Sequence, residues 1–128
     1  MNGILIAEEN RESRKIMADL CIEAGYSVTV TTTAAGVING ILKKTAGVLL
    51  LGSSFDELTA GELIPLLKKC CRNLKIILVS NDASLPVIRR LRSEGIFYHL
   101  LNPVMPEDRE EFKQVVACAF QRPDSCYC

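Results

Sequence analysis

The sequence lacks several features that would assign it to a common class of protein. Its fifteen basic and fifteen acidic residues cancel to a formal net charge of zero, so no overall attraction draws the chain to nucleic acid or to an anionic membrane. The opening MNGILIAEEN has a short apolar run that ends in two glutamates, which fits neither a secretory signal nor a membrane span. We therefore expect a cytoplasmic protein with no direct nucleic-acid or membrane partner.

Six cysteines are many for 128 residues, but their spacing does not indicate a metal site. The adjacent Cys70 and Cys71 and the terminal CYC lack the C-x2-C spacing with which two thiolates reach one tetrahedral zinc ion. Cys21 and Cys118 fall among apolar residues at helical spacing, where cysteine behaves as a small hydrophobe. Without an export signal we expect thiols rather than disulfides, and we predict no cofactor.

What the chain does contain is a regular alternation of strand-like and helix-like segments. The strand-like runs are residues 3–7, 26–32, 47–52, 74–81 and 96–102. The third and fourth runs are apolar on both faces, which is typical of central strands covered by helices on both sides. The alternation predicts one domain built on a parallel sheet with right-handed crossovers.

A helix is predicted after each strand-like run. The five helices run from Asn10 to Gly25, from 34 to 44, from 63 to 70 with Pro65 near the first turn, from about Pro86 to Gly95, and from Pro106 to 120. In the fourth helix, Val87, Ile88 and Leu91 are expected to face inward. The residues after 121 read as a frayed tail.

In open parallel sheets, ligands gather beyond the carboxyl ends of the strands. Two glutamates follow the first predicted strand, a glycine ends the third, a serine ends the fourth, and an asparagine and a proline end the fifth. The candidate site therefore consists of Glu8, Glu9, Gly52, Ser80, Asn102 and Pro103.

This arrangement resembles a response-regulator receiver domain, the phosphoryl-accepting module of two-component signalling, over residues 4–121. In that family the first strand ends in an acidic pair, as in ILIAEEN, and the fourth in serine or threonine, as in IILVSN. The fifth ends in lysine-proline, where this chain has LLNP. The resemblance implies a flavodoxin-like α/β fold in three layers, with five parallel strands in the order 2-1-3-4-5 and five helices. It implies one receiver-like domain at 1–121 and a tail at 122–128.

Two positions depart from the family pattern. The resemblance places the phosphoryl-accepting aspartate at Gly52 and the lysine at Asn102. An acyl phosphate needs a carboxylate nucleophile, which in this family also binds the divalent metal. Glycine supplies neither function, so we predict no metal site, with Glu8 and Glu9 as only weak candidate ligands. The chain is interpreted as a degenerate, non-phosphorylatable receiver, a protein-interaction module of a signalling pathway and not an enzyme.

The acidic pair would lack its usual positive partners. We therefore predict that Glu8 or Glu9 has a raised pKa or turns toward water, and that the amide of Asn102 could serve as a neutral partner. Two explanations of Gly52 stay open. Either the position is no longer selected for chemistry, or the next loop needs a conformation closed to side chains.

The resemblance places His99 where the family has an aromatic residue that moves together with the serine or threonine at the Ser80 position. Two interpretations stay open. His99 has no role, or its protonation near neutral pH replaces phosphorylation as an input.

The last two predicted helices carry opposite charges. The basic side chains are Arg89, Arg90 and Arg92, and the acidic ones are Glu107, Asp108, Glu110 and Glu111. Exposed charges are often merely solvated. In receiver dimers, however, the face made of the fourth helix, fifth strand and fifth helix commonly pairs with its own copy, which requires self-complementary charge. We predict a weak homodimer or a protein partner at this face.

Two other functions remain as alternatives. A phosphotransfer receiver could use an unusual acceptor such as Asp56, although this carboxylate comes four residues past the strand end and is expected in the loop, away from Glu9. A small-ligand-binding domain of the same architecture is the other alternative. Against it, the first strand-to-helix turn, AEENRES, has no glycine-rich phosphate loop.

Overall fold

The computed structural model describes residues 3–43, 46–52, 54–55, 58–80, 84–103 and 105–121, with only the backbone described at 54–55 and 58–60. Strands and helices follow one another along the chain in the predicted alternation. Their bounds are β1 Gly3–Ala7, α1 Arg11–Glu23, β2 Ser27–Thr31, α2 Ala34–Leu42, β3 Val48–Gly52, β4 Ser54–Phe55, β5 Leu58–Thr59, α3 Ala60–Cys70, β6 Lys75–Val79, α4 Leu85–Ser93, β7 Tyr98–Leu100 and α5 Pro106–Gln121.

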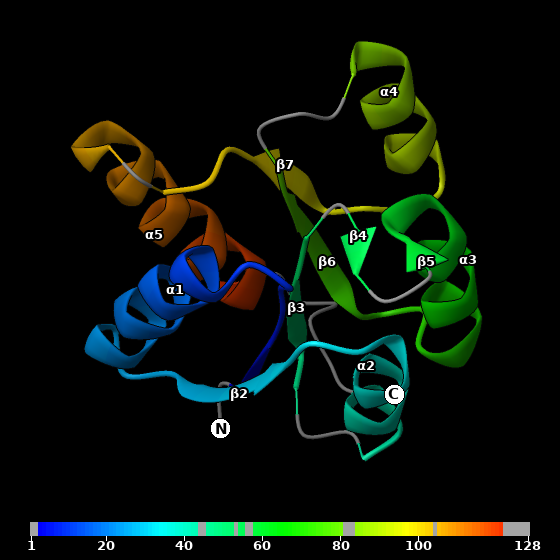
Figure 1. Ribbon diagram of the computed structural model, residues 1–128, viewed down its shortest axis with the longest axis horizontal. Coiled ribbons are helices and arrows are strands. Elements are labelled where there is room, and N and C mark those ends of the chain that lie inside the picture. The colour runs from blue at the N-terminus through cyan, green and yellow to red at the C-terminus, as the bar shows by residue number, and fades with distance from the viewer. Residues whose placement is uncertain are drawn as a thin grey trace.

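Five parallel strands form one sheet in the order β2-β1-β3-β6-β7. Counted along the chain this is the order 2-1-3-4-5, so the predicted flavodoxin-like architecture is confirmed. Helices α1 and α5 cover one face of the sheet, and α2, α3 and α4 cover the other (Figure 1). The apolar strands β1 and β3 lie in the middle and are buried at every position.

Two hydrophobic cores lie on opposite faces of the sheet. Strand residues alternate between them, because successive side chains of a strand point to opposite faces. In β3, Leu49 and Leu51 pack with the α2 and α3 side, whereas Val48 and Leu50 pack with α1 and α5. This two-sided burial explains why the central strands are continuous apolar runs rather than alternating ones.

Local signals set the ends of the helices. The Asn10 side chain accepts a hydrogen bond from the Ser13 N–H at 2.9 Å, which caps α1 as predicted. Gly25 and Gly95 follow α1 and α4 with φ of 92° and 107°, a backbone region that favours glycine. None of the helices in the described part of the chain is long and apolar enough to cross a membrane.

Helix α3 begins earlier than predicted, so Pro65 lies inside the helix and not near its first turn. Proline has no N–H, and the Gly61 carbonyl four residues earlier therefore lacks its usual helical donor. The Arg90 guanidinium of α4 donates to this Gly61 oxygen at 3.4 Å. The Gly61 carbonyl, which Pro65 leaves without a helical donor, therefore accepts a hydrogen bond that links α4 to α3.

A short antiparallel pair, β4 with β5, lies between β3 and α3, where the sequence suggested only a loop. Strands of two residues are too short to show a periodicity in the sequence. The alternative acceptor Asp56 lies between these strands and outside the described residues, so its proposed role stays a prediction.

The cysteine predictions need two corrections. Cys71 is buried and disulfide-bonded rather than a free thiol, and its partner lies outside the described residues. Cys118 is exposed, because the buried stripe of α5 consists of Phe112, Val115, Val116 and Ala119. Cys21 is a buried thiol as expected, and burial raises its pKa to about 12.

Candidate functional site

The carboxyl ends of the central strands bring the predicted site residues to one edge of the sheet. Gly52 pairs with Val79 in adjacent strands, and the Ser80 N–H donates to the Leu100 carbonyl at 2.9 Å. Glu8 directly follows the last residue of β1. The pairing therefore places Glu8, Gly52 and Ser80 on neighbouring strands at the same edge.

Glu8 turns inward at this edge and is only 9% exposed. The Asn10 N–H donates to its Oε2 atom at 3.0 Å. Burial raises the pKa of the Glu8 carboxyl above its ordinary value of 4.5, although the hydrogen bonds from Asn10 and Glu9 and the nearby charge of Arg14 oppose this. Glu9 is exposed to solvent. The predicted raised pKa is thus found at Glu8, and the predicted turn toward water is found at Glu9.

The Glu8 carboxyl lies where a side chain of residue 52 would begin. A Cβ atom built on Gly52 would be 2.8 Å from Glu8 Oε1 and 3.1 Å from Glu8 Cδ. Carbon and oxygen atoms do not approach so closely without a shift of one of them. Gly52 has no left-handed φ, so its own backbone does not require glycine. The Glu8 carboxyl, the far end of a flexible side chain, therefore occupies the space beside Gly52, and the two explanations of this glycine stay predictions.

Arg14 belongs to this site but was not singled out from the sequence. Its Nη1 atom donates to the Glu8 carbonyl oxygen at 2.9 Å and to the Glu9 carbonyl oxygen at 3.3 Å. The guanidinium thereby links α1 to the turn that follows β1. Because the guanidinium contacts main-chain oxygens, no motif in the sequence marks this role.

The remaining site positions differ in how far they are buried. Ser80 is 3% exposed and Pro103 is also buried, whereas Asn102 is half-buried. The role of Asn102 as a neutral partner for the glutamates stays a prediction. Among the residues that the structure describes, no group of three metal-ligating side chains occurs.

His99 contacts the end of the neighbouring strand. Its Nε2 atom lies 3.1 Å from the Ser80 carbonyl oxygen. A carbonyl oxygen only accepts, so this ring nitrogen carries the hydrogen and donates. The half-buried imidazole on β7 thus reaches the main chain of Ser80, the residue with which the resemblance couples it.

The face made of α4, β7 and α5 carries the predicted charges at its surface. All the predicted charged side chains of this face are exposed except Asp108, which is half-buried; the exposed ones are Arg89, Arg90, Arg92, Glu107, Glu110 and Glu111. Arg90 differs from its neighbours because it contacts the Gly61 carbonyl and lies 3.7 Å from Glu94 Oε1. Arg90 therefore also has a role within the fold.

The same face presents apolar side chains that the sequence did not reveal. Val87 was expected to face inward but is 44% exposed, because α4 buries only Leu91 completely. Other large apolar residues are also exposed from α4 to the start of α5: Leu85, Tyr98, Leu101 and Met105. A short helix with one buried position cannot hide every apolar residue that its sequence contains.

The chain has the fold of response-regulator receiver domains, as comparison with solved structures shows. A response regulator receiver domain protein (CheY-like) from Methanospirillum hungatei JF-1 matches with a TM-score of 0.81 and 21% identity, over 94% of this chain and 98% of that one. The beryllofluoride-activated NtrC4 receiver domain dimer matches with a TM-score of 0.85 and 16% identity, over 94% and 98%.

A third similar structure contains a metal ion. It is the receiver domain of the sensor histidine kinase PA1611 from Pseudomonas aeruginosa PAO1, described with magnesium coordinated in the active site cleft; it matches with a TM-score of 0.81 and 15% identity, over 94% and 98%. No protein-family model and no curated protein match the sequence. At identities this low the likeness establishes the fold, and function must be argued from the site.

Proposed function

We propose that the chain is a degenerate receiver domain, a regulatory module that acts through protein contacts and not through phosphorylation of an aspartate. One observation carries the proposal: the acceptor position is Gly52, and the Glu8 carboxyl lies against it. A phosphoryl acceptor must present a free carboxylate to the donor and to a divalent metal. Among the residues that the structure describes, the carboxyl group against Gly52 is that of Glu8, which is buried and hydrogen-bonded to the chain.

Two further features support the loss of phosphoryl chemistry. The lysine position is Asn102, which cannot supply a positive charge to a phosphoryl group. Burial also favours the neutral form of Glu8, whereas metal binding requires an ionised carboxylate. The similar domain of PA1611 binds magnesium in its cleft, and we propose that this chain does not use its corresponding edge in that way.

The proposed contact surface is the face made of α4, β7 and α5. It combines arginines on α4, acidic residues on α5 and exposed apolar side chains such as Val87 and Tyr98. Apolar residues surrounded by charges are typical of protein interfaces. A similar structure, that of NtrC4, is a dimer. We therefore infer a weak homodimer or a signalling protein partner at this face.

Intact-mass measurement after incubation with acetyl phosphate and magnesium tests the central claim. We expect no stable gain of one phosphate under conditions that phosphorylate a receiver with an intact aspartate. A gain in the wild type would overturn the proposal. The variant Glu8→Gln would then identify the acceptor, since its loss of the modification would assign the phosphate to Glu8.

Analytical ultracentrifugation over a range of concentrations tests the contact surface. The wild type should show a weakly associating dimer, and the charge reversal Arg89→Glu should weaken it by about tenfold or more. Lys69→Glu is the matched control, because Lys69 is an exposed cation on α3 outside this face. A dimer weakened equally by both variants, or a strictly monomeric wild type that binds no protein of its pathway, would contradict the assignment.

A further inference from the structure

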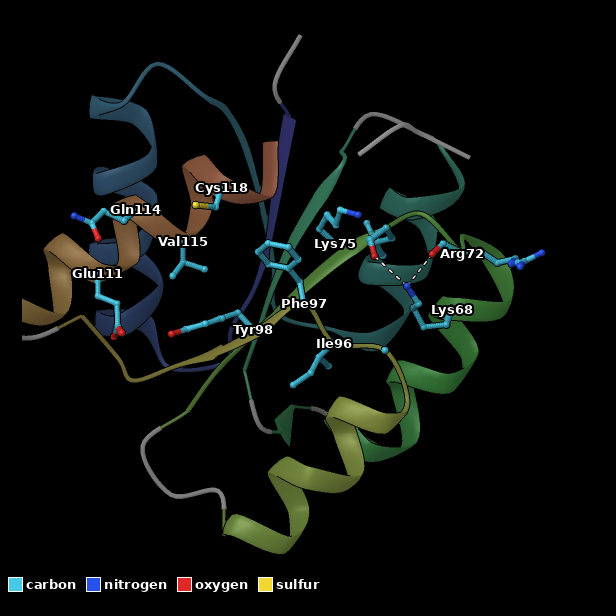
Figure 2. A pocket seen from close by; sticks show the side chains of 12 residues that line it. Lys68, Arg72, Lys75, Ile96, Phe97, Tyr98, Glu111, Gln114, Val115 and Cys118 are labelled. Carbon is cyan, nitrogen blue, oxygen red and sulfur yellow. Dashed lines mark hydrogen bonds between the residues drawn. The ribbon is translucent and has the colours of Figure 1, made fainter. Parts of the chain in front are cut away.

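The amino edge of the sheet, where the parallel strands begin, contains a cavity of about 640 Å³ opposite to the candidate site. One wall comes from the end of α3 and the start of β6, and its basic side chains are Lys68, Arg72 and Lys75. The other wall is one side of α5, and the segment that enters β7 lies between the two walls (Figure 2). The cavity therefore lies between α3 and α5, which cover opposite faces of the sheet.

Half of the cysteines lie at this same edge. Cys70 ends α3, and Cys71 follows it directly, next to the cavity-lining Arg72. Cys118 of α5 lines the opposite wall of the cavity. Cys70 and Cys118 are exposed thiols, whereas Cys71 is only 5% exposed and is disulfide-bonded. The amino edge thus combines a disulfide with two accessible thiols.

The number of cysteines limits the choice of partner for Cys71. The sequence contains six cysteines, and those that are free thiols in the described residues are Cys21, Cys70 and Cys118. Cys126 and Cys128 remain, five and seven residues after Gln121, the last residue of α5. A chain of this length reaches about 17–25 Å when it is extended. A bond from Cys71 to either cysteine joins the end of α3 to the chain that follows α5.

Cys71 suits its surroundings with or without this bond. It packs in the core on the α2 and α3 side of the sheet, in the same cluster as Ala46 and Leu74. A cysteine thiol behaves as a small hydrophobe, and Cys21 is already a buried thiol in the opposite core. Burial keeps such a thiol protonated, so no charge would be left in the core. Opening the bond can therefore release the chain after α5 while both cores stay packed.

The neighbouring thiols favour a reversible bond over a permanent one. Disulfide frameworks of exported domains pair their cysteines, whereas three of the six cysteines of this chain are free thiols. Disulfides exchange when a thiolate attacks one of their sulfurs, and the exposed Cys70 is adjacent to Cys71 in the chain. A single disulfide among exposed thiols is typical of redox regulation rather than of a structural framework.

We infer that this disulfide is a redox switch, which a dithiol reductant of the thioredoxin type opens. One thiolate of the reductant attacks the sulfur bonded to Cys71, because Cys71 itself is buried. The Cys71 sulfur leaves and takes up a proton. The second thiol of the reductant then displaces the sulfur of Cys126 or Cys128, which also takes up a proton. Two electrons and two protons pass to the protein, and the reductant keeps a disulfide of its own.

The closed bond links the two walls of the cavity. Arg72 of one wall is adjacent to Cys71, and Cys118 of the other wall lies three residues before the end of α5. Reduction removes this covalent link, so the amino edge opens more readily. The inference does not depend on the proposed loss of phosphorylation, because the switch and the degenerate site share no residue.

Non-reducing peptide mapping by mass spectrometry tests the bond. The protein is kept without reductant, its free thiols are blocked with N-ethylmaleimide, and fragment spectra locate the disulfide. We expect one disulfide, from Cys71 to Cys126 or Cys128. Cys71→Ser should remove it, whereas Cys70→Ser, the matched control at the adjacent exposed thiol, should retain it. A bond at Cys70, the same link in Cys71→Ser, or no disulfide at all would overturn the inference.

Amide hydrogen exchange in the two redox states tests the switch. Excess reduced thioredoxin should open the bond and speed exchange in residues 71–75 by about tenfold or more, while residues 49–52 keep their protection. Cys71→Ser should exchange like the reduced wild type in both states, and Cys70→Ser should respond as the wild type does. A bond that resists thioredoxin, a protein that unfolds on reduction, or unchanged exchange at residues 71–75 would contradict the switch.

Discussion

The two edges of the sheet differ in how the chain fills them. At the carboxyl edge, Glu8 turns back over Gly52 and occupies the space of a missing side chain. At the amino edge, the chain leaves a cavity of about 640 Å³ with a basic wall. Open α/β sheets usually bind ligands at the carboxyl edge. The difference shows that the fold sets where a site can form, and that individual side chains determine whether there is space for a ligand.

Both edges depend on the same central strands, and the largest expected effect comes from weakening these. Leu50 lies in β3 and is fully buried in the core shared with α1 and α5. Leu50→Ala should lower the free energy of unfolding by about 3 kcal/mol, since it leaves a cavity. Chemical denaturation measures this, with the half-exposed Leu66 as the control. A similar loss for Leu66→Ala would contradict the two-core description.

A glycine substitution at the amino edge should have the next largest effect. Gly95 has a φ of 107°, and an added Cβ would lie 3.0 Å from Lys68 Cε. Gly95→Ala should cost about 2 kcal/mol, because the backbone is strained and the Lys68 stem must shift. Gly25→Ala is the matched control: Gly25 has a φ of 92° but no neighbour within 4 Å. The difference between the two costs in denaturation therefore reports the Lys68 contact, and equal costs would show that the contact is unimportant.

The smallest expected effect is a pH dependence at the carboxyl edge. Because the pKa of Glu8 is raised in the folded state, the folded protein binds this proton more tightly than the unfolded chain. The resulting stabilisation is complete below the ordinary pKa of 4.5 and is lost as the pH rises through the raised value. Denaturation midpoints of wild type and Glu8→Gln should diverge accordingly, with the wild type losing stability relative to the variant as the pH rises. Parallel curves would mean that Glu8 is not buried in solution.

The sequence predicts the architecture well because the fold depends on features that are local or periodic. The continuous apolar runs of β3 and β6 identify central strands, and Asn10 and Gly25 mark the ends of α1. Each of these sequence features determines the structure of the residues next to it, so it can be recognised without knowledge of distant contacts. The resemblance then predicts the order of the strands, and the structure confirms this order.

The site could be predicted only in part, because its geometry depends on contacts between distant segments. The sequence identifies Glu8 and Gly52 as members of one edge but cannot show that one fills the space of the other. Arg14 acts through backbone carbonyls, which no motif records. The exposure of Val87 and Cys118 depends on how far each helix is covered by its neighbours, and a helical period does not contain that information.

The position of Glu8 also bears on how the site could be changed by mutation. An aspartate placed at position 52 by mutation would bring a second carboxyl group to Glu8, because a Cβ atom there would already lie 2.8 Å from Glu8 Oε1. To make room, the Glu8 carboxyl would have to shift, which disturbs its hydrogen bond with the Asn10 N–H. An acceptor engineered at position 52 therefore depends on two groups at once, the new carboxyl and the one that already fills its place.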